Sequence, residues 1–258
     1  MCTVTLYRDA TSVLVTMNRD ELHARAPERP PTVFEEAGSR GQWMAPIDGE
    51  AGGTWMGVNA CGVVACLLNA YLPGDTVSRP RAPSRLSRGT IVPAILAQGD
   101  GSCVQAWMRG KFDPSPYEPF YLLVAWLGGG MKWRWAETTY AAHPLGKDGW
   151  TLVSSSLLEP DETLAWRREA FEQWRRAGCE KRGCVPTYHL LQVEGKEDWS
   201  PLMDRQLGGT RSITQVHVDG ASRRSVLRYW PREKSSGVPV APAAELCLPV
   251  LEYAPGPA

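Results

Sequence analysis

The stretch Gly62-Val63-Val64-Ala65-Cys66-Leu67-Leu68-Asn69 carries an unbroken apolar run from Val63 to Leu68. It predicts a strand, and the preceding Thr54–Asn59 is expected to form the other arm of a hairpin. A strand that does not alternate between apolar and polar residues is buried on both faces. We therefore expect another layer of structure on each side of it.

Further strands are expected in pairs before and after helices, not in strict alternation with them. The expected strands are 2–8, 12–17, 119–127, 131–138, 150–155, 210–218 and 225–230, and the expected helices are 90–98, 102–109, 161–177 and 186–193. The clearest helix is 161–177, with Asp161 as its expected N-cap and Gly178 after its end. This order predicts an α+β fold of antiparallel sheets with helices packed outside them.

No linker divides residues 1–230, so we expect a single domain there. The segments 23–42 and 72–87 are expected to be surface loops because prolines and charged residues interrupt any regular pattern. The segment 231–258 is rich in Pro, Ala and Ser and is expected to be a loosely packed C-terminal extension.

Composition excludes several classes of function. The 28 basic and 28 acidic side chains balance, which gives no support for nucleic-acid binding. No apolar run is long enough to insert into a membrane. Seven cysteines without framework spacing favour reduced thiols in the cytoplasm. Cys179 and Cys184 are expected to be surface thiols and not zinc ligands, and neither a metal nor a cofactor is expected.

Cys2, directly after the initiator Met1, is the main candidate for chemistry. Removal of Met1 leaves a thiol and an α-amine on one residue, and that amine titrates at about pH 8. Such an amine can take a proton from the thiol, so one residue supplies both nucleophile and base. The following β-branched segment predicts a strand that holds this terminus in place. The alternative is a cysteine found at position 2 by chance.

Several motifs together resemble one family. They are Met1-Cys2-Thr3, Asn18-Arg19-Asp20-Glu21, Gly52-Gly53-Thr54-Trp55-Met56-Gly57-Val58-Asn59, Leu68-Asn69, Ser87-Arg88-Gly89 and Gly209-Thr210-Arg211. This pattern resembles the NRDE proteins, the family of transport and Golgi organisation protein 2, over roughly residues 1–230. The resemblance implies the N-terminal nucleophile hydrolase fold, a four-layer αββα sandwich with two central antiparallel sheets.

A looser resemblance extends to penicillin V acylase and the choloylglycine hydrolases, which begin with a processed cysteine. It implies that Arg19 and Asp20 lie beside the nucleophile. A guanidinium there favours the thiolate, and the carboxylate accepts from the α-amine. The alternative for Arg19-Asp20-Glu21 is a solvated turn after a strand.

The same resemblance implies an oxyanion site made from Asn69, at the end of the apolar strand. The alternative is that Asn69 only begins a turn. The family often has a second asparagine where this chain has Ser155, whose hydroxyl reaches less far. Arg211 is expected to bind a substrate carboxylate or, alternatively, to form an ion pair between strands. Within the quoted motifs, the expected substrate-binding residues are Asn18, Trp55, Asn59 and Arg88.

The sequence therefore predicts an N-terminal cysteine amidohydrolase that cleaves a linear amide after Met1 is removed. The catalytic residues are expected to be Cys2, Arg19, Asp20, Asn69, Ser155 and Arg211. The alternative is a non-catalytic protein on the same fold that binds haem, acyl-CoA or another apolar ligand, since the family is linked to such handling. The expected partner is accordingly a small-molecule amide or an apolar ligand.

Overall fold

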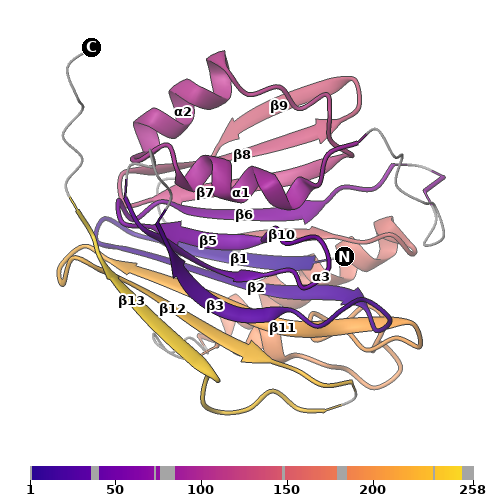
Figure 1. Ribbon diagram of the computed structural model, residues 1–258. Coiled ribbons are helices and arrows are strands. Elements are labelled where there is room, and N and C mark those ends of the chain that lie inside the picture. The colour runs from indigo at the N-terminus through magenta and orange to yellow at the C-terminus, as the bar shows by residue number, and fades with distance from the viewer. Residues whose placement is uncertain are drawn as a thin grey trace.

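The computed structural model describes residues 2–35, 41–72, 74–75, 85–146, 149–178, 185–234 and 236–251, and its strands form two stacked sheets (Figure 1). Sheet A contains, in spatial order, β10 (Gly149–Ser155), β1 (Cys2–Arg8), β2 (Ser12–Leu22), β11 (Gly208–Asp219), β12 (Arg224–Pro231) and β13 (Ala244–Pro249). Sheet B contains β3 (Arg29–Phe34), β4 (Trp43–Ile47), β5 (Met56–Asn59), β6 (Val64–Asn69), β7 (Phe120–Trp126), β8 (Gly129–Ala136) and β9 (Thr139–Pro144). All neighbouring strands pair antiparallel.

Helices cover the outer faces of both sheets. The short 3₁₀ turn η1 (Arg88–Thr90) leads into α1 (Ile91–Leu96), and α1 and α2 (Gly101–Gly110) pack on sheet B (Figure 1). On the other side, α3 (Pro160–Arg176) and the 3₁₀ turn η2 (Thr187–Leu190) pack against sheet A. The predicted α+β sandwich of two antiparallel sheets flanked by helices is confirmed.

The apolar strand β6 shows why the layers stack in this way. Its Val64, Cys66 and Leu68 lie in the core between the two sheets. Val63, just before the strand, and Ala65 and Leu67 lie in the core between sheet B and its helices. The strand is therefore buried on both faces, as the absence of alternation predicts.

The strands that the sequence did not predict are mostly edge strands. Three of them, β3, β9 and β13, each have only one paired neighbour within the described residues. Edge strands tolerate proline, as at Pro30 and Pro31 in β3, and most residues of β3 and β9 are exposed or half-buried. The expectation of a loosely packed extension at 231–258 does not hold for residues 244–249, which pair with β12.

The start of α3 also differs from the prediction. The helix begins at Pro160, and Glu159 stands at the N-cap in the left-handed conformation with φ 42°. Asp161 lies inside the first turn instead of capping the helix, where its charge favours the N-terminal end of the helix dipole. The segment 186–193 forms only the short turn η2.

Candidate active site

Cys2, Arg19 and Ser155 lie side by side across three strands of sheet A. In the antiparallel register, Cys2 of β1 pairs with Arg19 of β2 on one side and with Ser155 of β10 on the other. Directly opposed residues project to the same face, here the face towards sheet B. The backbone N–H of Cys2 donates to Ser155 Oγ at 3.3 Å. Residues distant in sequence thus meet around one sulfur.

A cavity of about 300 Å³ opens at this row, and we call it the Cys2 cavity. Its wall includes Cys2, Arg19, Asp20, Glu21, Arg25, Asp48, Trp55, Asn69, Arg88 and Glu118. A second cavity of about 420 Å³ shares Asp20, Glu21 and Asn69 with it. We call the second one the leucine cavity, because Leu22, Leu157, Leu158 and Leu207 line it. The shared residues place the two cavities next to each other.

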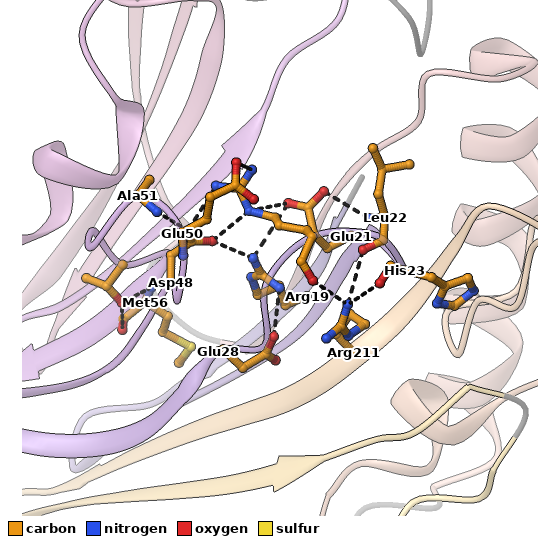
Figure 2. A network of polar contacts seen from close by, with 12 residues as sticks. Arg19, Glu21, Leu22, His23, Glu28, Asp48, Glu50, Ala51, Met56 and Arg211 are labelled. Atoms are coloured by element: carbon orange, nitrogen blue, oxygen red, sulfur yellow. Dashed lines mark hydrogen bonds and ion pairs between the residues drawn. The ribbon is translucent and has the colours of Figure 1, made fainter.

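Arg19 is held by two carboxylates (Figure 2) and also lies against the ring of Trp55. Its guanidinium nitrogens lie 2.6 Å from Asp48 Oδ2 and 2.9 Å from Glu28 Oε2. The guanidinium carbon lies 4.5 Å from the centre of the Trp55 ring, within the range of a cation–π contact. A buried charge needs such partners, because desolvation without them is costly.

Asp48 is the centre of this ion network. Its carboxylate also accepts from Arg25 Nε at 3.0 Å, from Arg25 Nη2 at 2.9 Å and from the Ala51 N–H at 2.7 Å. Burial opposes ionisation of Asp48, but the hydrogen bonds from Arg25 and Ala51 and the arginine charges lower its pKa to about 2. Asp48 therefore stays charged at any ordinary pH.

Asp20 differs from its neighbour Arg19 because one of its oxygens is unsatisfied. Thr210 Oγ1 donates to Asp20 Oδ1 at 2.7 Å. The other oxygen, Oδ2, is buried and has no hydrogen-bond partner among the described residues. Burial raises the pKa of Asp20, while the charge of Arg167 and the Thr210 hydrogen bond act against this. A buried acceptor of this kind is ready to receive a donor.

The environment of Cys2 keeps the thiol neutral at rest. Burial raises the pKa of Cys2, and the negative charge of Asp20 adds to this. The charge of the N-terminal amine, a hydrogen bond from the Asp20 backbone and the charge of Arg19 act in the opposite direction without cancelling the effect of burial. Loss of the thiol proton therefore requires a base close to the sulfur.

Asn69 ends β6 at the rim of both cavities. Its backbone pairs with Phe120 of β7, which fixes the position of the residue. No hydrogen bond to its side-chain amide is found within the described part of the chain, so the amide N–H groups are available to a ligand. Asn69 and Cys2 line the same cavity from opposite sheets.

Close backbone contact brings Arg88 to the site. A Cβ on Gly53 would lie 2.6 Å from the carbonyl carbon of Gly89, so only glycine fits there. The Thr54 N–H donates to Gly89 O at 3.0 Å, which joins the two glycine motifs. Arg88 then lines the Cys2 cavity and donates to Pro119 O at 2.7 Å.

The comparison with family models decides what the chain is related to. The model of Transport and Golgi organisation 2 matches residues 1–223. The chain belongs to this family. The resemblance found in the motifs is thereby confirmed.

Solved structures show which fold this Transport and Golgi organisation 2 family member adopts. It superposes on the N-acylethanolamine-hydrolyzing acid amidase ortholog of Caenorhabditis elegans with a TM-score of 0.55 and 13% identity, over 83% of this chain and 92% of that chain. Penicillin V acylase from Agrobacterium tumefaciens gives a TM-score of 0.51 and 13% identity, over 88% and 82%. A cysteine-to-alanine mutant of the conjugated bile acid hydrolase from Clostridium perfringens gives 0.51 and 9%, over 96% and 92%. At these identities the similarity shows the N-terminal nucleophile hydrolase fold.

A search of curated proteins by sequence finds no match. The family and the fold are therefore known, whereas any activity has to be argued from the site itself.

Two residues predicted to bind substrate lie elsewhere in the structure of this family member. Asn18 faces away from sheet B, and its amide nitrogen donates to His189 O at 2.9 Å and Pro201 O at 2.7 Å. Asn59 donates to Leu96 O and Gly99 O and accepts from the N–H groups of the β5–β6 turn. Both amides are fully used within the fold. Neither residue is among those that line the Cys2 cavity.

Arg211 also differs from both of its expected roles. It stands at an irregularity in the β2–β11 register. Its Nη1 donates to the carbonyl oxygens of Leu22, His23 and Arg25, at 3.1, 3.4 and 3.4 Å (Figure 2). It does not line the Cys2 cavity. Arg211 therefore holds the chain after β2 and does not face the sulfur.

Glu28 and Asp48, the carboxylates that hold Arg19, were not predicted from the sequence. Glu28 lies in the segment 23–42, which was expected to be a solvated loop, and yet its side chain is only 6% exposed. The available signal was the balance of charge: a buried Arg19 requires carboxylate partners, and the nearby loops are rich in them.

The described residues contain no cluster of His, Cys, Asp or Glu with the arrangement of a metal site. Cys179 and Cys184 lie outside the described residues. Within the described ranges, no helix combines the length and the apolar character that crossing a membrane requires.

Proposed function

We propose that this protein is an N-terminal cysteine amidohydrolase that cleaves a linear amide with Cys2 as its nucleophile. The observation that carries this proposal is the joint presence of three groups in one cavity. They belong to Cys2, to Asp20, whose Oδ2 has no hydrogen-bond partner among the described residues, and to Asn69. They correspond to a nucleophile, an acceptor that orients a base, and an oxyanion donor.

The first step forms a thioester. After removal of Met1, the free α-amine of Cys2 takes the proton from Sγ, and the sulfur attacks the carbonyl carbon of the amide. The C–S bond forms and the carbonyl oxygen becomes an oxyanion, which Asn69 stabilises, with Ser155 Oγ as the second donor. The C–N bond then breaks, and the leaving amine takes the proton from the α-ammonium.

The second step returns the enzyme to its starting state. The α-amine takes a proton from a water molecule, whose oxygen attacks the thioester carbonyl. The C–S bond breaks, the carboxylic acid leaves, and the sulfur regains its proton. Throughout, Asp20 Oδ2 accepts from the α-amine and fixes its orientation. The raised pKa of Cys2 fits this scheme, because the resting thiol needs its own base.

Two arguments support an amide with an apolar part as the substrate. The structural neighbours are described as an acid amidase, an acylase and a conjugated bile acid hydrolase. The Cys2 cavity is polar, with Arg88 and Trp55 in its wall, whereas leucines line the adjoining cavity. Arg88 and Trp55 are the predicted substrate-binding residues that face the Cys2 cavity. We expect the reaction to take place in the cytoplasm, because the seven cysteines suit a reducing compartment.

The test is the substitution Cys2→Ala, assayed on a panel of N-acyl amides. Turnover is expected to fall by roughly 10⁴-fold or more, because the nucleophile is removed. The midpoint of thermal unfolding is expected to stay within a few degrees. The matched control is Cys66→Ala, which removes the neighbouring buried thiol of the same core and is expected to keep turnover. Full turnover in Cys2→Ala, or a mature protein that retains Met1 while turning over substrate, rejects the proposal.

A second candidate function is binding of an apolar ligand such as haem or an acyl-CoA without turnover. The leucine cavity favours it, because its walls suit an apolar body and Arg205 stands at its edge. Binding is measured by a shift of the Soret band or by quenching of tryptophan fluorescence. Equal binding by the parent protein and Cys2→Ala, with no turnover by either, favours this function over hydrolysis.

A further inference from the structure

Arg19 and Arg25, two of the arginines in the wall of the Cys2 cavity, are each balanced by carboxylates. Arg19 contacts Asp48 and Glu28, and Arg25 contacts Asp48 in a bidentate arrangement. In addition, Glu21 Oε2 lies 3.6 Å from Arg19 Nη2 and 3.6 Å from Arg25 Nε. The carboxylates around these two cations at least equal them in number, so the network gives the sulfur little net positive field.

Asp48 also joins three parts of the cavity wall. It binds Arg19 on β2 and Arg25 in the following loop, and it accepts the N–H groups of Glu50 and Ala51 in the turn that leads to Trp55. The Asp48 N–H donates to Gly53 O at 2.8 Å and closes that turn. This turn packs on the loop, since a Cβ on Gly49 would lie 1.8 Å from Pro27 O.

We propose that Asp48 is a positioning residue that fixes Arg19 between Trp55 and Glu28 and neutralises its charge beside Cys2. The site thereby keeps the thiol protonated until its own α-amine removes the proton. This role deepens the proposed function and rests on its choice of Cys2 as nucleophile.

The groups that act on Cys2 come from several elements. The charges that act on it directly are those of the N-terminal amine, Asp20 and Arg19. The other titratable groups that line the cavity or interact with Cys2 are Glu21, Arg25, Asp48, Arg88, Glu118 and, on β6, Cys66. Asp48, with a pKa of about 2, does not titrate in the range where a thiol does. A change in the titration of Cys2 on altering Asp48 therefore reports the charge balance around Arg19.

The test is Asp48→Asn, which keeps the shape and the acceptor oxygen but removes the charge. Glu28 and Trp55 still hold Arg19 beside Cys2 in this variant, so its charge acts on the sulfur with less compensation. The rate of Cys2 alkylation by iodoacetamide is measured against pH by mass spectrometry. We expect the midpoint to fall by about one pH unit, which is a roughly tenfold rise in rate below the midpoint.

The matched control is Glu50→Gln, which removes a carboxylate of the same network at its solvent side. Glu50 lies 3.6 Å from Arg25 and its side chain is 57% exposed, so water screens it. In Glu50→Gln, the midpoint of Cys2 alkylation against pH is expected to stay close to that of the parent protein. An unchanged or higher midpoint in Asp48→Asn, or an equal shift in Glu50→Gln, overturns the proposal.

A second variant keeps the test decisive should Asp48→Asn fail to fold. Arg25→Gln leaves Asp48 with Arg19 as its one arginine partner among the described residues, which strengthens the neutralisation. The midpoint of Cys2 alkylation is expected to rise, and an unchanged or lower midpoint overturns the proposal. Alkylation needs no turnover, so this result is separate from the Cys2→Ala assay. If the protein does not hydrolyse amides, the shift in the midpoint of Cys2 alkylation can still be measured. If the midpoint does not shift, the Cys2→Ala assay still tests hydrolysis.

Discussion

Sheet A buries polar and charged groups on both faces of β1 and β2, and the two faces satisfy them differently. On the face towards α3 and η2 lies an outer polar layer formed by Thr3, Thr5, Asn18, Arg167 and His189. Arg167 donates to two hydroxyls, Thr3 Oγ1 and Ser154 Oγ, and to two carbonyls. Both ring nitrogens of His189 have partners, Thr5 Oγ1 and Asn18 Oδ1, each at 2.6 Å.

On the face towards sheet B, the Cys2 cavity leaves groups unsatisfied. Within the part of the chain that the structure describes, Trp55 Nε1 is buried without a hydrogen-bond partner and no hydrogen bond to the side-chain amide of Asn69 is found. Asp20 accepts from Thr210 beside it in the register, and it also lines the cavity. Its other oxygen, Oδ2, is buried without a hydrogen-bond partner among the described residues. Saturated polar groups stabilise a fold, whereas unsatisfied ones need another explanation. The difference teaches that the polar residues of one strand divide into structural and ligand-facing groups by their partners, not by their type.

Among the variants that compare the two faces, the largest effect is expected from changing one residue on each of them. Asp20→Asn keeps the Thr210 hydrogen bond but removes the charge that orients the α-amine. We expect turnover to fall by roughly 10²-fold or more, with little change in stability. Asn18→Ala removes hydrogen bonds from a site without solvent, so we expect a loss of about 3 kcal/mol in the free energy of unfolding.

Both variants are assayed for kcat/KM and for unfolding in urea. Per folded molecule, Asn18→Ala is expected to keep the parent kcat/KM within a few-fold. If Asn18→Ala instead loses turnover while remaining stable, Asn18 returns to the substrate-binding set and the division between the two faces fails.

The layers of the fold were predictable from local pattern. The unbroken apolar run of β6 required cover on both sides, and the β-branched residues after Cys2 gave β1. The edge strands β3 and β9 could not be predicted in this way, because most of their residues are exposed or half-buried. The burial of β13 does alternate, but Cys247 and Pro249 at its exposed positions hide this alternation in the sequence. Such strands are defined by the sheet that they join.

The site was predictable only in part, for a related reason. The register alone brings Arg19 and Ser155 to Cys2, and the apolar β6 brings Asn69 to the rim. The roles of Asn18, Asn59 and Arg211 were not readable, because a motif does not say which groups accept its hydrogen bonds. The contacts of Glu28 and Asp48 with Arg19 could not be predicted, because they depend on how the loops that carry these carboxylates fold onto Arg19.

A smaller effect is expected on the pH dependence of the free energy of unfolding, and it differs between the two faces of sheet A. Asn18 Oδ1 can only accept, so His189 Nδ1 carries the proton and Nε2 accepts from Thr5. Burial lowers the pKa of His189 to about 3. Between this value and the usual pKa of about 6.5, the unfolded chain binds more protons than the folded one. Stability should therefore fall as the pH falls below about 6.5, by roughly 1 kcal/mol per pH unit.

The carboxylates around Cys2 affect the free energy of unfolding over a different pH range. The pKa of Asp48 is lowered to about 2, so its contribution is present above about pH 4 and is lost only below that. Asp20, whose pKa burial raises, acts in the opposite direction to His189. For this reason the measurement is a difference between the parent protein and His189→Gln, by urea unfolding from pH 8 to pH 4.5. If the difference in the free energy of unfolding between the parent protein and His189→Gln does not narrow as the pH falls, His189 is not neutral and buried as described.

The smallest expected effect tests which arginine contacts substrate. The hydrogen bonds from Arg211 to the chain after β2 are long, at 3.1 to 3.4 Å. Arg211→Gln should therefore cost less than about 1 kcal/mol of stability and leave KM within about twofold. Arg88→Gln, on the wall of the Cys2 cavity, should raise KM more than it lowers kcat, because it removes binding without touching the nucleophile. Should Arg211→Gln raise KM as much as Arg88→Gln, the chain after β2 moves on binding, and Arg211 belongs with the ligand-facing groups after all.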